Sequence, residues 1–559
     1  MIVYQHPKES FMIHVRENRI DEVLYDNFIN KLGRKTSRNE VNSWRNSLQY
    51  MRNVLDDQNI PNDALISIEC QIPNTSKRID FIISGQDETK RDCAVVVELK
   101  QWETAQRTNM DGIVRAFVGG ANREVSHPSY QAWSYVTLLE GFNEEVYESD
   151  IHLQPCAFLH NCETAGDLGS EFYAKYLEKA PLFLRKDVIA LSRFIRQYVK
   201  FGDSKNIMYR IEKGRIRPSR TLADSVARMI QGNEEFVMID DQKVIFEQAM
   251  ALVRNPGPKK RVMIVKGGPG TGKSVVAVQL TAQLTIQQKL VQFVSKNRAP
   301  RDVFASRLSG YRAQTWINNL FKGSGSYLNA ENNSFDALVV DEAHRLNEKS
   351  GLYSNLGENQ IAEIIRAAKC AVFFIDEDQR VTMLDIGTIE QIEYCAEITY
   401  ATLESQFRCN GSDGYLAWLD NFLGIRPTAN TRIEETGYNL AVCSSANELR
   451  SKINELNKSR NKARLVAGYC WPWNSKKNPN AMDIVLPEER FEMQWNLDKD
   501  GPLWIISADS VNQVGCIHTC QGLEVDWIGV IIGPDLVIRN GQWVSDSRSR
   551  ARGDKSVHG

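Results

Sequence analysis

The sequence lacks the cysteine spacings of a disulfide framework or a zinc site. Its 559 residues include 11 cysteines, an odd number, and no two of them are separated by only two residues. Cys516 and Cys520 form the tightest pair. We therefore expect reduced thiols in a cytoplasmic protein, because disulfide-rich domains and zinc sites use cysteines at short, paired spacings.

Long apolar runs and an excess of charge are also absent. The opening MIVYQHPKES has no cationic region followed by an apolar run, and no apolar stretch approaches the ~20 residues of a membrane span, so neither a signal peptide nor a membrane partner is expected. With 68 basic and 70 acidic residues the net charge is -2, so a nucleic-acid-binding surface would have to be local. One candidate is the basic run at Lys213, Arg215, Arg217 and Arg220. A solvated linker is the alternative interpretation.

A phosphate-binding loop occupies the middle of the sequence. The pattern G-x-x-x-x-G-K-S at 267–274 follows the apolar run 262–265 and precedes 275–278, which is predicted to begin a helix. Lys273 is expected to reach the β- and γ-phosphates of ATP, and Ser274 to bind Mg²⁺. The turn that would surround the phosphates contains Gly268, Gly270, Thr271 and Gly272. A glycine-rich turn without a nucleotide is the alternative.

Two further apolar runs end in acidic residues. The run 337–340 leads directly into Asp341 and Glu342, and the run 371–375 leads into Asp376-Glu377-Asp378-Gln379. Downstream of a phosphate loop, Asp341 is expected to complete the Mg²⁺ shell and Glu342 to act as general base on the attacking water. Strands that each end in polar residues predict a parallel sheet with its site at the carboxyl ends.

A second group of candidate residues lies in the N-terminal third. The runs 78–84 and 93–102 are strand-like, and pairing Asp80 with Glu98 centres the intervening turn on residue 89, within a polar stretch. Glu98 and Lys100 then share one face of a strand. Asp80 and Glu98 could hold a divalent metal while Lys100 orients or activates a water for phosphodiester attack. The alternative is that Glu98 and Lys100 form a solvated pair.

This triad resembles that of the PD-(D/E)xK nuclease superfamily. Gln131 and Tyr135 lie four apart and resemble the Q-x-x-x-Y element of RecB-like nucleases, which implies that they help to position the metal site and the DNA backbone. The alternative is that Tyr135 belongs to an aromatic core. The resemblance also suggests a helical acid at the metal site, for which Glu40 and Glu69 compete.

The motif series at 235–533 resembles superfamily 1 helicases and, within them, the Schlafen group 3 DNA/RNA helicase domain. The resemblance implies that SKN (295–297) contacts nucleic acid and that two RecA-like lobes close on ATP. It assigns additional residues, which are Gln242 to adenine, Gln379 to sensing the γ-phosphate, Arg408 to an arginine finger, His518 and Thr519 to the nucleic-acid backbone, and Gln521 to Glu524 to the nucleotide cleft. No match to a last helicase motif follows Gly533, so the second lobe is expected to be incomplete within this sequence.

These patterns predict an α/β protein with a mixed-sheet nuclease domain (1–205), a basic linker (206–230) and two RecA-like parallel-sheet lobes (231–400 and 401–559). The prediction is an ATP-dependent nuclease-helicase with ATP and Mg²⁺, or Mn²⁺ at the nuclease site. It is expected to act on DNA in preference to RNA, as in bacterial nuclease-helicase fusions of anti-phage defence. The rivals are an ATP-gated nuclease that does not unwind and a nuclease fold that only binds nucleic acid. The sequence does not decide the oligomeric state.

Overall fold

The computed structural model describes residues 2–554 except 33–35, 37, 73–76, 215–227, 230–236, 256, 258, 351–355, 381, 383, 397, 404–412, 434–438 and 497–500. Its contacts divide the chain into two compact units. The described residues of the first unit lie within 1–220 and Val237–Gln248, and most of those of the second lie within Ala249–Leu403 and Ser412–Gly559. The expected α/β class is confirmed at the level of a mixed α/β chain with several parallel-sheet regions. Val237–Gln248 groups with the first unit, although the sequence placed it in the first RecA-like lobe.

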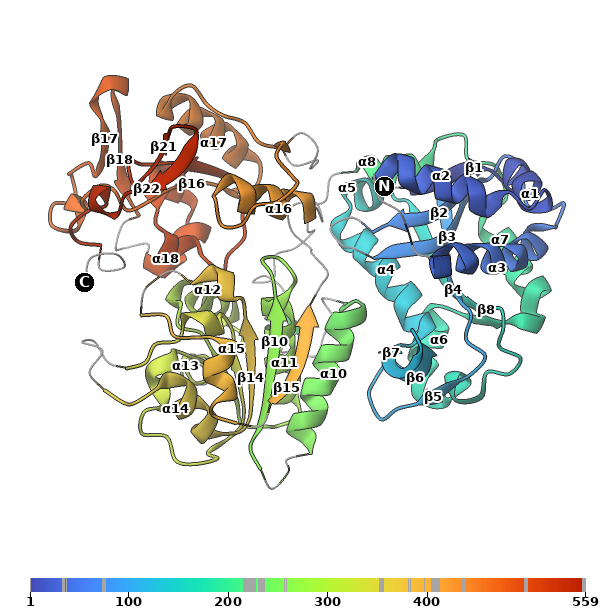
Figure 1. Cartoon of the computed structure of the whole chain (residues 1–559), viewed down its shortest axis with the longest axis horizontal. Helices are drawn as coiled ribbons and strands as arrows, with labels where there is room; N and C mark the ends of the chain where they lie inside the picture. Colours follow the sequence, from blue (N-terminus) through green and yellow to red (C-terminus); the bar gives the residue numbers. More distant parts are fainter. Residues whose placement is uncertain are drawn as a thin grey trace. The chain divides into compact units, whose positions relative to one another are not determined.

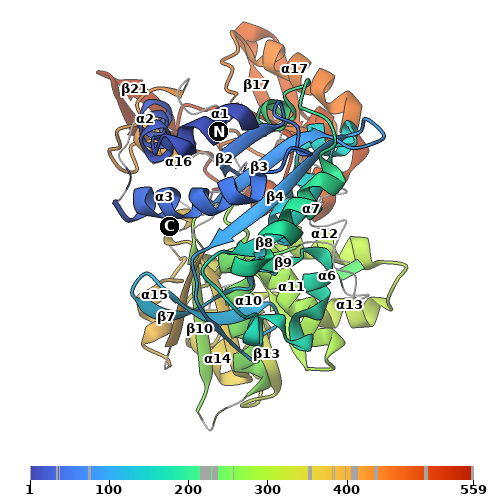
Figure 2. The same cartoon turned by 90° about the vertical axis from the view of Figure 1, so that its right-hand side faces the viewer.

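The first unit is built on a six-stranded mixed sheet with the order β1-β2-β3-β4-β8-β9 (Figure 2). Strands β1 to β4 are antiparallel neighbours, and β8 runs parallel to β4. The elements of this unit are β1 (Ile2–Pro7), α1 (Lys8–Arg16), α2 (Ile20–Leu32), α3 (Arg38–Leu55), β2 (Leu65–Gln71), β3 (Arg78–Gln86), β4 (Asp92–Lys100), β5 (Ala105–Arg107), β6 (Ile113–Val118), β7 (Ala121–Ser126), α4 (Pro128–Phe142), α5 (Glu144–Glu148), β8 (His152–Leu159), α6 (Ala174–Lys179), β9 (Leu182–Leu184), α7 (Val188–Tyr198), α8 (Ile207–Lys213) and the first part of α10 (Asp240–Arg254).

The hairpin β3–β4 has the predicted register. Phe81 pairs with Val97, and Gln86 pairs with Asp92, so the turn is centred on residue 89. Extending the register by one residue places Asp80 beside Glu98, at the end of the hairpin away from the turn. The side chains alternate between faces as a β-period requires. Phe81 and Val97 pack in the core with α1, α2, α3 and α7, whereas Ile82 and Val96 pack with residues of α4 and α8.

The second unit contains two larger sheets and the two-stranded sheet β21-β22 (Figure 1). The first has the order β12-β11-β13-β14-β10-β15 with parallel pairing throughout, and the second has the order β17-β18-β19-β16-β20. Their elements are β10 (Arg261–Gly267), α11 (Lys273–Ile286), β11 (Val291–Val294), α12 (Arg298–Leu308), α13 (Gln314–Leu320), β12 (Phe321–Lys322), β13 (Phe335–Val340), α14 (Gln360–Ala367), β14 (Ala368–Ile375), α15 (Ile389–Glu393), β15 (Ile398–Leu403), α16 (Asp413–Phe422), α17 (Ala446–Arg460), β16 (Ala463–Ala467), β17 (Ile484–Leu486), β18 (Phe491–Trp495), β19 (Gln513–Gly515), α18 (Ile517–Cys520), β20 (Trp527–Ile531), β21 (Leu536–Arg539) and β22 (Gln542–Ser545).

The parallel pairing confirms the expected placement of the polar strand ends. Strand β10 lies between β14 and β15, and β14 separates it from β13. Because the three strands are parallel, the residues that follow Gly267, Val340 and Ile375 emerge at the same edge of the sheet. In the second sheet, β16 is parallel to β19 and β20, while β17 is antiparallel to β18. Of the helices that the structure describes, none has the length and apolar character of a membrane span.

The packing around Gly515 gives a stability prediction. A Cβ at Gly515 would lie 2.4 Å from Cη2 of Trp504, a fully buried side chain. We expect Gly515→Ala to lower the free energy of unfolding by about 1–3 kcal/mol, because an added methyl group in a packed core forces its neighbours to move. Denaturant unfolding of the full chain measures this.

Gly141→Ala is the contrasting control. Gly141 lies within α4, and no heavy atom among the described residues would lie within 4 Å of the added Cβ. Alanine should stabilise this helix by about 0.5–1 kcal/mol because glycine loses more backbone entropy on folding. Equal effects of the two substitutions would contradict the packing argument.

Candidate nucleotide and metal sites

The phosphate loop joins β10 to α11 through a backbone that only glycine adopts readily. Gly270 and Gly272 have φ angles of +76° and +85°, and α11 begins at Lys273. Lys273 Nζ donates to the carbonyl oxygens of Gly267 and Gly268, each at 2.8 Å. The loop therefore places a buried ammonium at the start of a helix, where backbone N–H groups and the helix dipole favour an anion.

Ser274 and Asp341 meet at the sheet edge. Ser274 Oγ donates to Asp341 Oδ2 at 2.7 Å, which links the start of α11 to the end of β13. Burial, together with the neighbouring Glu342, raises the pKa of Asp341 to about 6. A hydroxyl and a carboxylate at this position are the hard oxygen ligands that Mg²⁺ prefers.

Glu342 is held in an unusual backbone conformation. Its φ of +55° lies in the left-handed region, which costs energy for a residue other than glycine and often marks a functional position. Glu342 Oε2 lies 3.1 Å from His344 Nε2. His344 Nδ1 accepts from the Asp376 N–H at 3.3 Å, so the ring proton is on Nε2 and faces Glu342.

The same contact keeps Glu342 ionised. Burial alone would raise the pKa of Glu342, but the hydrogen bond with His344 and the charge of Lys273 hold it below its ordinary value. A buried carboxylate that stays ionised at neutral pH can accept a proton from water.

Asp376 connects Gln379 to the phosphate loop. Gln379 Nε2 donates to Asp376 Oδ2 at 2.8 Å, and the same oxygen lies 3.7 Å from Lys273 Nζ. Gln379 and Lys273 are therefore linked through one intervening carboxylate, and Asp341 is linked to Ser274, the neighbour of Lys273.

Gln521 connects the second sheet to this edge. Its backbone oxygen accepts from Asn297 Nδ2 at 2.8 Å, and its side-chain oxygen accepts from Arg345 Nη1. A Cβ built on Gly522 would lie 3.7 Å from Glu342 Oε1. The segment that the sequence assigned to the nucleotide cleft thus lies beside the candidate general base.

Arg345 is itself anchored by a buried carboxylate that sequence reasoning missed. Asp385 is fully buried and accepts from Arg345 Nε at 2.9 Å and from Lys296 Nζ at 2.8 Å. Thr382 adds two further donors, its N–H and its hydroxyl, each at 2.8 Å. Lys296, which was predicted to contact nucleic acid, therefore donates to the same buried carboxylate as Arg345.

Several predicted residues are not brought to the nucleotide site by described contacts. Gln242 lies in the first unit, where its Oε1 accepts from the Ile239 N–H at 3.4 Å, and Glu524 is exposed. Thr519 Oγ1 donates to the Cys516 carbonyl at 2.8 Å. Arg408 and the His518 side chain lie outside the described residues. The roles assigned to these residues stay predictions.

The triad of the first unit comes together at the end of β3 and β4. Asp80 Oδ2 accepts from the Leu99 N–H at 2.8 Å, and Lys100 Nζ donates to Glu98 Oε1 at 2.6 Å. Glu98 is 1% exposed, and its Oε2 has no hydrogen-bond partner among the described residues. A buried carboxylate oxygen without a donor is a position where a cation would be favourable.

The charges at this site influence each other strongly. Burial raises the pKa of Asp80, and burial together with the Asp80 charge raises the pKa of Glu98 well above its ordinary value. Burial would lower the pKa of Lys100, but Glu98 and Asp80 raise it. The described residues contain no group of three or more acidic, histidine or cysteine side chains arranged to hold a metal. A cation here would therefore depend on two carboxylates and on water, which suits Mg²⁺.

Gln131 and Tyr135 lie together on α4, as their spacing predicts. Gln131 Nε2 donates to Tyr135 Oη at 2.7 Å, and Tyr135 packs against the face of the sheet that carries Ile82 and Val96. Tyr135 also donates to Asp240, a residue that the sequence did not assign to this site. Asp240 lies in the segment Val237–Gln248, which precedes the phosphate loop in the sequence. No motif in that segment predicted that it would fold into the N-terminal unit.

Both competitors for the helical acid bind the same arginine. Arg78 Nη1 lies 2.8 Å from Glu69 Oε2, and Arg78 Nη2 lies 2.6 Å from Glu40 Oε1. Trp44 Nε1 donates to Glu69 Oε1 at 2.7 Å. Burial raises the pKa of Glu69 to about 7, against the opposing charge of Arg78. Glu69, on β2, is the acid nearer to Asp80 in the sheet register.

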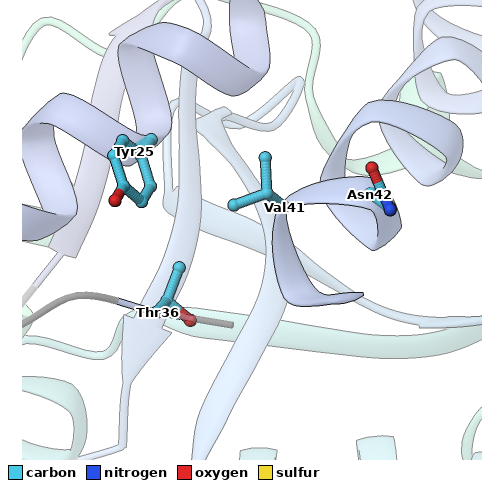
Figure 3. Close-up of a pocket in the computed structure, with 4 residues that line it drawn as sticks. All are labelled: Tyr25, Thr36, Val41 and Asn42. Atoms are coloured by element: carbon cyan, nitrogen blue, oxygen red, sulfur yellow. The ribbon is translucent and has the colours of Figure 1, made fainter. Parts of the chain in front are cut away.

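A pocket of about 320 Å³ lies next to Glu40. It is lined by Tyr25 of α2, by Thr36, and by Val41 and Asn42 of α3 (Figure 3). The Thr36 hydroxyl donates to Glu40. The pocket is therefore joined to the charged row of Glu40, Arg78 and Glu69 through one hydrogen bond.

Two sequence expectations concern the surface and the cysteines. Lys213 is the last residue of α8, which packs within the first unit, and Arg215, Arg217 and Arg220 lie outside the described residues. Every described cysteine is a free thiol, as the spacing predicted.

Comparisons with known proteins agree with the site in the second unit. Residues 260–559, more than half of the chain, match the family described as Schlafen group 3, DNA/RNA helicase domain. The uncharacterized protein YPL245W of Saccharomyces cerevisiae is 21% identical over 327 residues, which are 49% of this chain and 68% of the yeast protein. AMPPCP-bound DnaA from Aquifex aeolicus is 12% identical, with 43% of this chain and 65% of that chain covered and a TM-score of 0.18. The chain thus spans less than two thirds of DnaA, and so low a TM-score supports no statement about fold or ligand.

Glu69 gives a pH prediction. Its pKa is about 7 in the folded chain against 4.5 for an ordinary glutamate, so the folded state binds this proton more tightly than the unfolded state. The resulting stabilisation is complete below pH 4.5 and is lost as the pH rises through 7. We expect wild type to lose about 3 kcal/mol more than Glu69→Gln between pH 4.5 and pH 8. Urea unfolding at several pH values measures the difference, and the exposed Glu163→Gln should follow wild type.

Asp385 gives a second prediction. Asp385→Asn leaves the buried Arg345 and the half-buried Lys296 without their shared carboxylate, and should lower the free energy of unfolding by about 3–5 kcal/mol. Asp302→Asn is the control, because Asp302 pairs with an exposed arginine one helical turn away and should cost only about 0.5 kcal/mol. Chemical denaturation measures the free energy of unfolding of both variants. Equal losses in Asp385→Asn and Asp302→Asn would show that the burial of Asp385 adds nothing to the strength of its ion pairs.

Proposed function

Because the chain belongs to the family defined by the Schlafen group 3 DNA/RNA helicase domain, we propose that it is an ATP-driven helicase or translocase joined to a metal-dependent nuclease. We expect it to act on nucleic acid, with DNA preferred to RNA. A role in anti-phage defence is proposed from the resemblance to bacterial nuclease-helicase fusions.

The convergence of Lys273, Asp341 and Glu342 at one sheet edge carries the ATPase part of the proposal. Lys273 now donates to two loop carbonyls, and these are weak partners that phosphate oxygens would replace. Glu342 accepts the proton of the attacking water, and His344 orients its carboxylate. Gln379, linked to Lys273 through Asp376, is placed to respond to the γ-phosphate.

The donor set fits ATP with Mg²⁺. Ser274 and Asp341 would hold the metal, and the loop residues Gly268, Gly270, Thr271 and Gly272 would surround the phosphates together with Lys273. When bound, the metal neutralises phosphate charge. Arg408 would add charge from the second lobe, and Gln242 would contact adenine.

Asp80, Glu98 and Lys100 carry the nuclease part. The two carboxylates would hold Mg²⁺ or Mn²⁺, a role supported by the buried Oε2 of Glu98, which has no hydrogen-bond partner in the part of the chain that the structure describes. Lys100, which donates to Glu98, would orient or activate the attacking water. The order of elements around this site supports a PD-(D/E)xK fold. Helix α3 precedes the antiparallel strands β2 to β4, and α4 precedes β8, which is parallel to β4.

One observation favours the alternative of an ATP-gated nuclease that does not unwind. Asp240 begins the helix that precedes the phosphate-loop strand in sequence, yet it hydrogen-bonds to Tyr135 of the nuclease-like unit. The two activities would then be linked along the chain. Strand separation that requires ATP would decide for the helicase.

The test compares wild type, Lys100→Ala and Lys273→Ala on linear and circular DNA with Mg²⁺ or Mn²⁺, with and without ATP. We expect Lys100→Ala to lose cleavage but keep ATP hydrolysis. Lys273→Ala should lose ATP hydrolysis by about a hundredfold or more, because the lysine contacts the transferred phosphate directly.

Matched lysines control for the loss of a surface charge. Lys175→Ala changes an exposed lysine of the first unit, and Lys369→Ala changes an exposed lysine at the start of β14, at the edge opposite the phosphate loop. Both should behave as wild type. Absence of metal-dependent cleavage by folded wild type would overturn the nuclease part, and full ATP hydrolysis by Lys273→Ala would overturn the ATPase part.

A further inference from the structure

The segment Val237–Gln248 is an integral part of the first unit. Met238 O accepts from the Tyr130 hydroxyl, and Ile239 packs in the same core as Val96 and Tyr135. At the other end, Lys243 Nζ lies 3.1 Å from Asp111 Oδ2. The position of Asp240, between these two anchors, is therefore fixed by contacts on both sides.

Asp240 is the last acceptor in a chain of hydrogen bonds in which each group donates to the next. Gln131 Nε2 donates to Tyr135 Oη at 2.7 Å, and Tyr135 Oη donates to Asp240 Oδ2 at 2.5 Å. A phenol has a single proton, so Asp240 determines where the Tyr135 hydroxyl points. Tyr135 is 1% exposed, so bulk water is a poor substitute acceptor for its hydroxyl.

The charge of Asp240 also reaches the triad. Burial and Asp80 dominate the rise in the pKa of Glu98, and the Asp240 charge adds to it. The same charge favours the ammonium form of Lys100. Lys77 Nζ lies 3.8 Å from Asp240 Oδ2 and 3.3 Å from Asp241 Oδ1, so a second ammonium balances this acidic pair.

We propose that Asp240 is a positioning residue of the nuclease-like site: it orients the Tyr135 hydroxyl, and through it Gln131, beside Glu98 and Lys100. The inference rests on the proposed nuclease function. It implies that residues 1–220 do not contain the complete site, because one of its members comes from the segment that precedes the phosphate-loop strand. Without Asp240, the Tyr135 proton would turn to another acceptor.

The test measures metal-dependent DNA cleavage by the full chain with Asp240→Ala, Asp240→Asn, Tyr135→Phe and the double variant Asp240→Ala/Tyr135→Phe. Asp240→Ala should lower kcat about tenfold and leave KM for DNA within about twofold, as expected when orientation and not binding is lost. Asp240→Asn keeps an acceptor for Tyr135 and should retain more activity. The double variant should be no slower than the slower single variant, because both changes remove one interaction.

Asp241→Asn is the matched control. It removes a carboxylate charge from the adjacent position and leaves the Tyr135 hydrogen bond in place, so kcat should stay within about twofold of wild type. ATP hydrolysis and the melting temperature of each variant show whether the chain is still folded. If Asp240→Ala does not fold, the test compares kcat of Asp240→Asn with kcat of Asp241→Asn. Asp240→Asn should be the slower of the two, and equal values would overturn the inference.

A second readout separates positioning from metal binding. Calorimetric titration with Mn²⁺ should give the same affinity for Asp240→Asn and wild type within about twofold, whereas Asp80→Asn should bind at least about tenfold more weakly. A tenfold loss in Asp240→Asn would make Asp240 a metal ligand and overturn the positioning role. Undiminished cleavage by Asp240→Ala would overturn the inference alone, whereas absence of cleavage by wild type would overturn the proposed function as well.

Discussion

The alignment of three parallel strands determines the chemistry of the second unit. Strands β10, β13 and β14 end at one edge, so the phosphate loop, Asp341 and Asp376 emerge side by side although they are far apart in sequence. The contacts between Ser274 and Asp341, and between Lys273 and Asp376, follow from this alignment. A slip of one residue between β13 and β14 would turn the side chains that face the core to the other face, so the core that surrounds these strands also fixes the site.

The first unit reaches a similar result with antiparallel strands. The β3–β4 hairpin brings Asp80 beside Glu98, and the Leu99 N–H that Asp80 accepts holds one carboxylate oxygen in place. The buried Glu98 and the half-buried Asp80 share one lysine, and burial raises the pKa of both carboxyl groups because it makes their charged forms unfavourable. The second unit buries Asp341 and Glu342 as well but surrounds them with Lys273, His344 and Ser274.

Local pattern predicted most of what the structure places together, and contacts between distant segments account for the rest. The turn arithmetic around residue 89 gave the hairpin register, and the strand-end rule placed the residues after Val340 and Ile375 at one edge of a parallel sheet, because both depend on neighbouring strands. Asp385 and Asp240 carry no motif. Their roles arise only when Arg345 and Tyr135 find an acceptor from a distant segment, which spacing along the chain does not encode.

Gln521 links the second sheet to the sheet edge that carries the phosphate loop. Lobe closure in an ATPase requires that a residue of one sheet touch a group whose environment changes with the phosphate, and Gln521 touches Arg345, which follows the Asp341-Glu342 pair by a few residues. Arg345 is fixed from behind by Asp385, and Asn297 holds the Gln521 backbone. A shift at Glu342 would thus act on Gln521 through a side chain that has little freedom to absorb it, because the buried ion network resists rearrangement. The contacts of Gln521 therefore join the second sheet to the segment that carries Asp341 and Glu342.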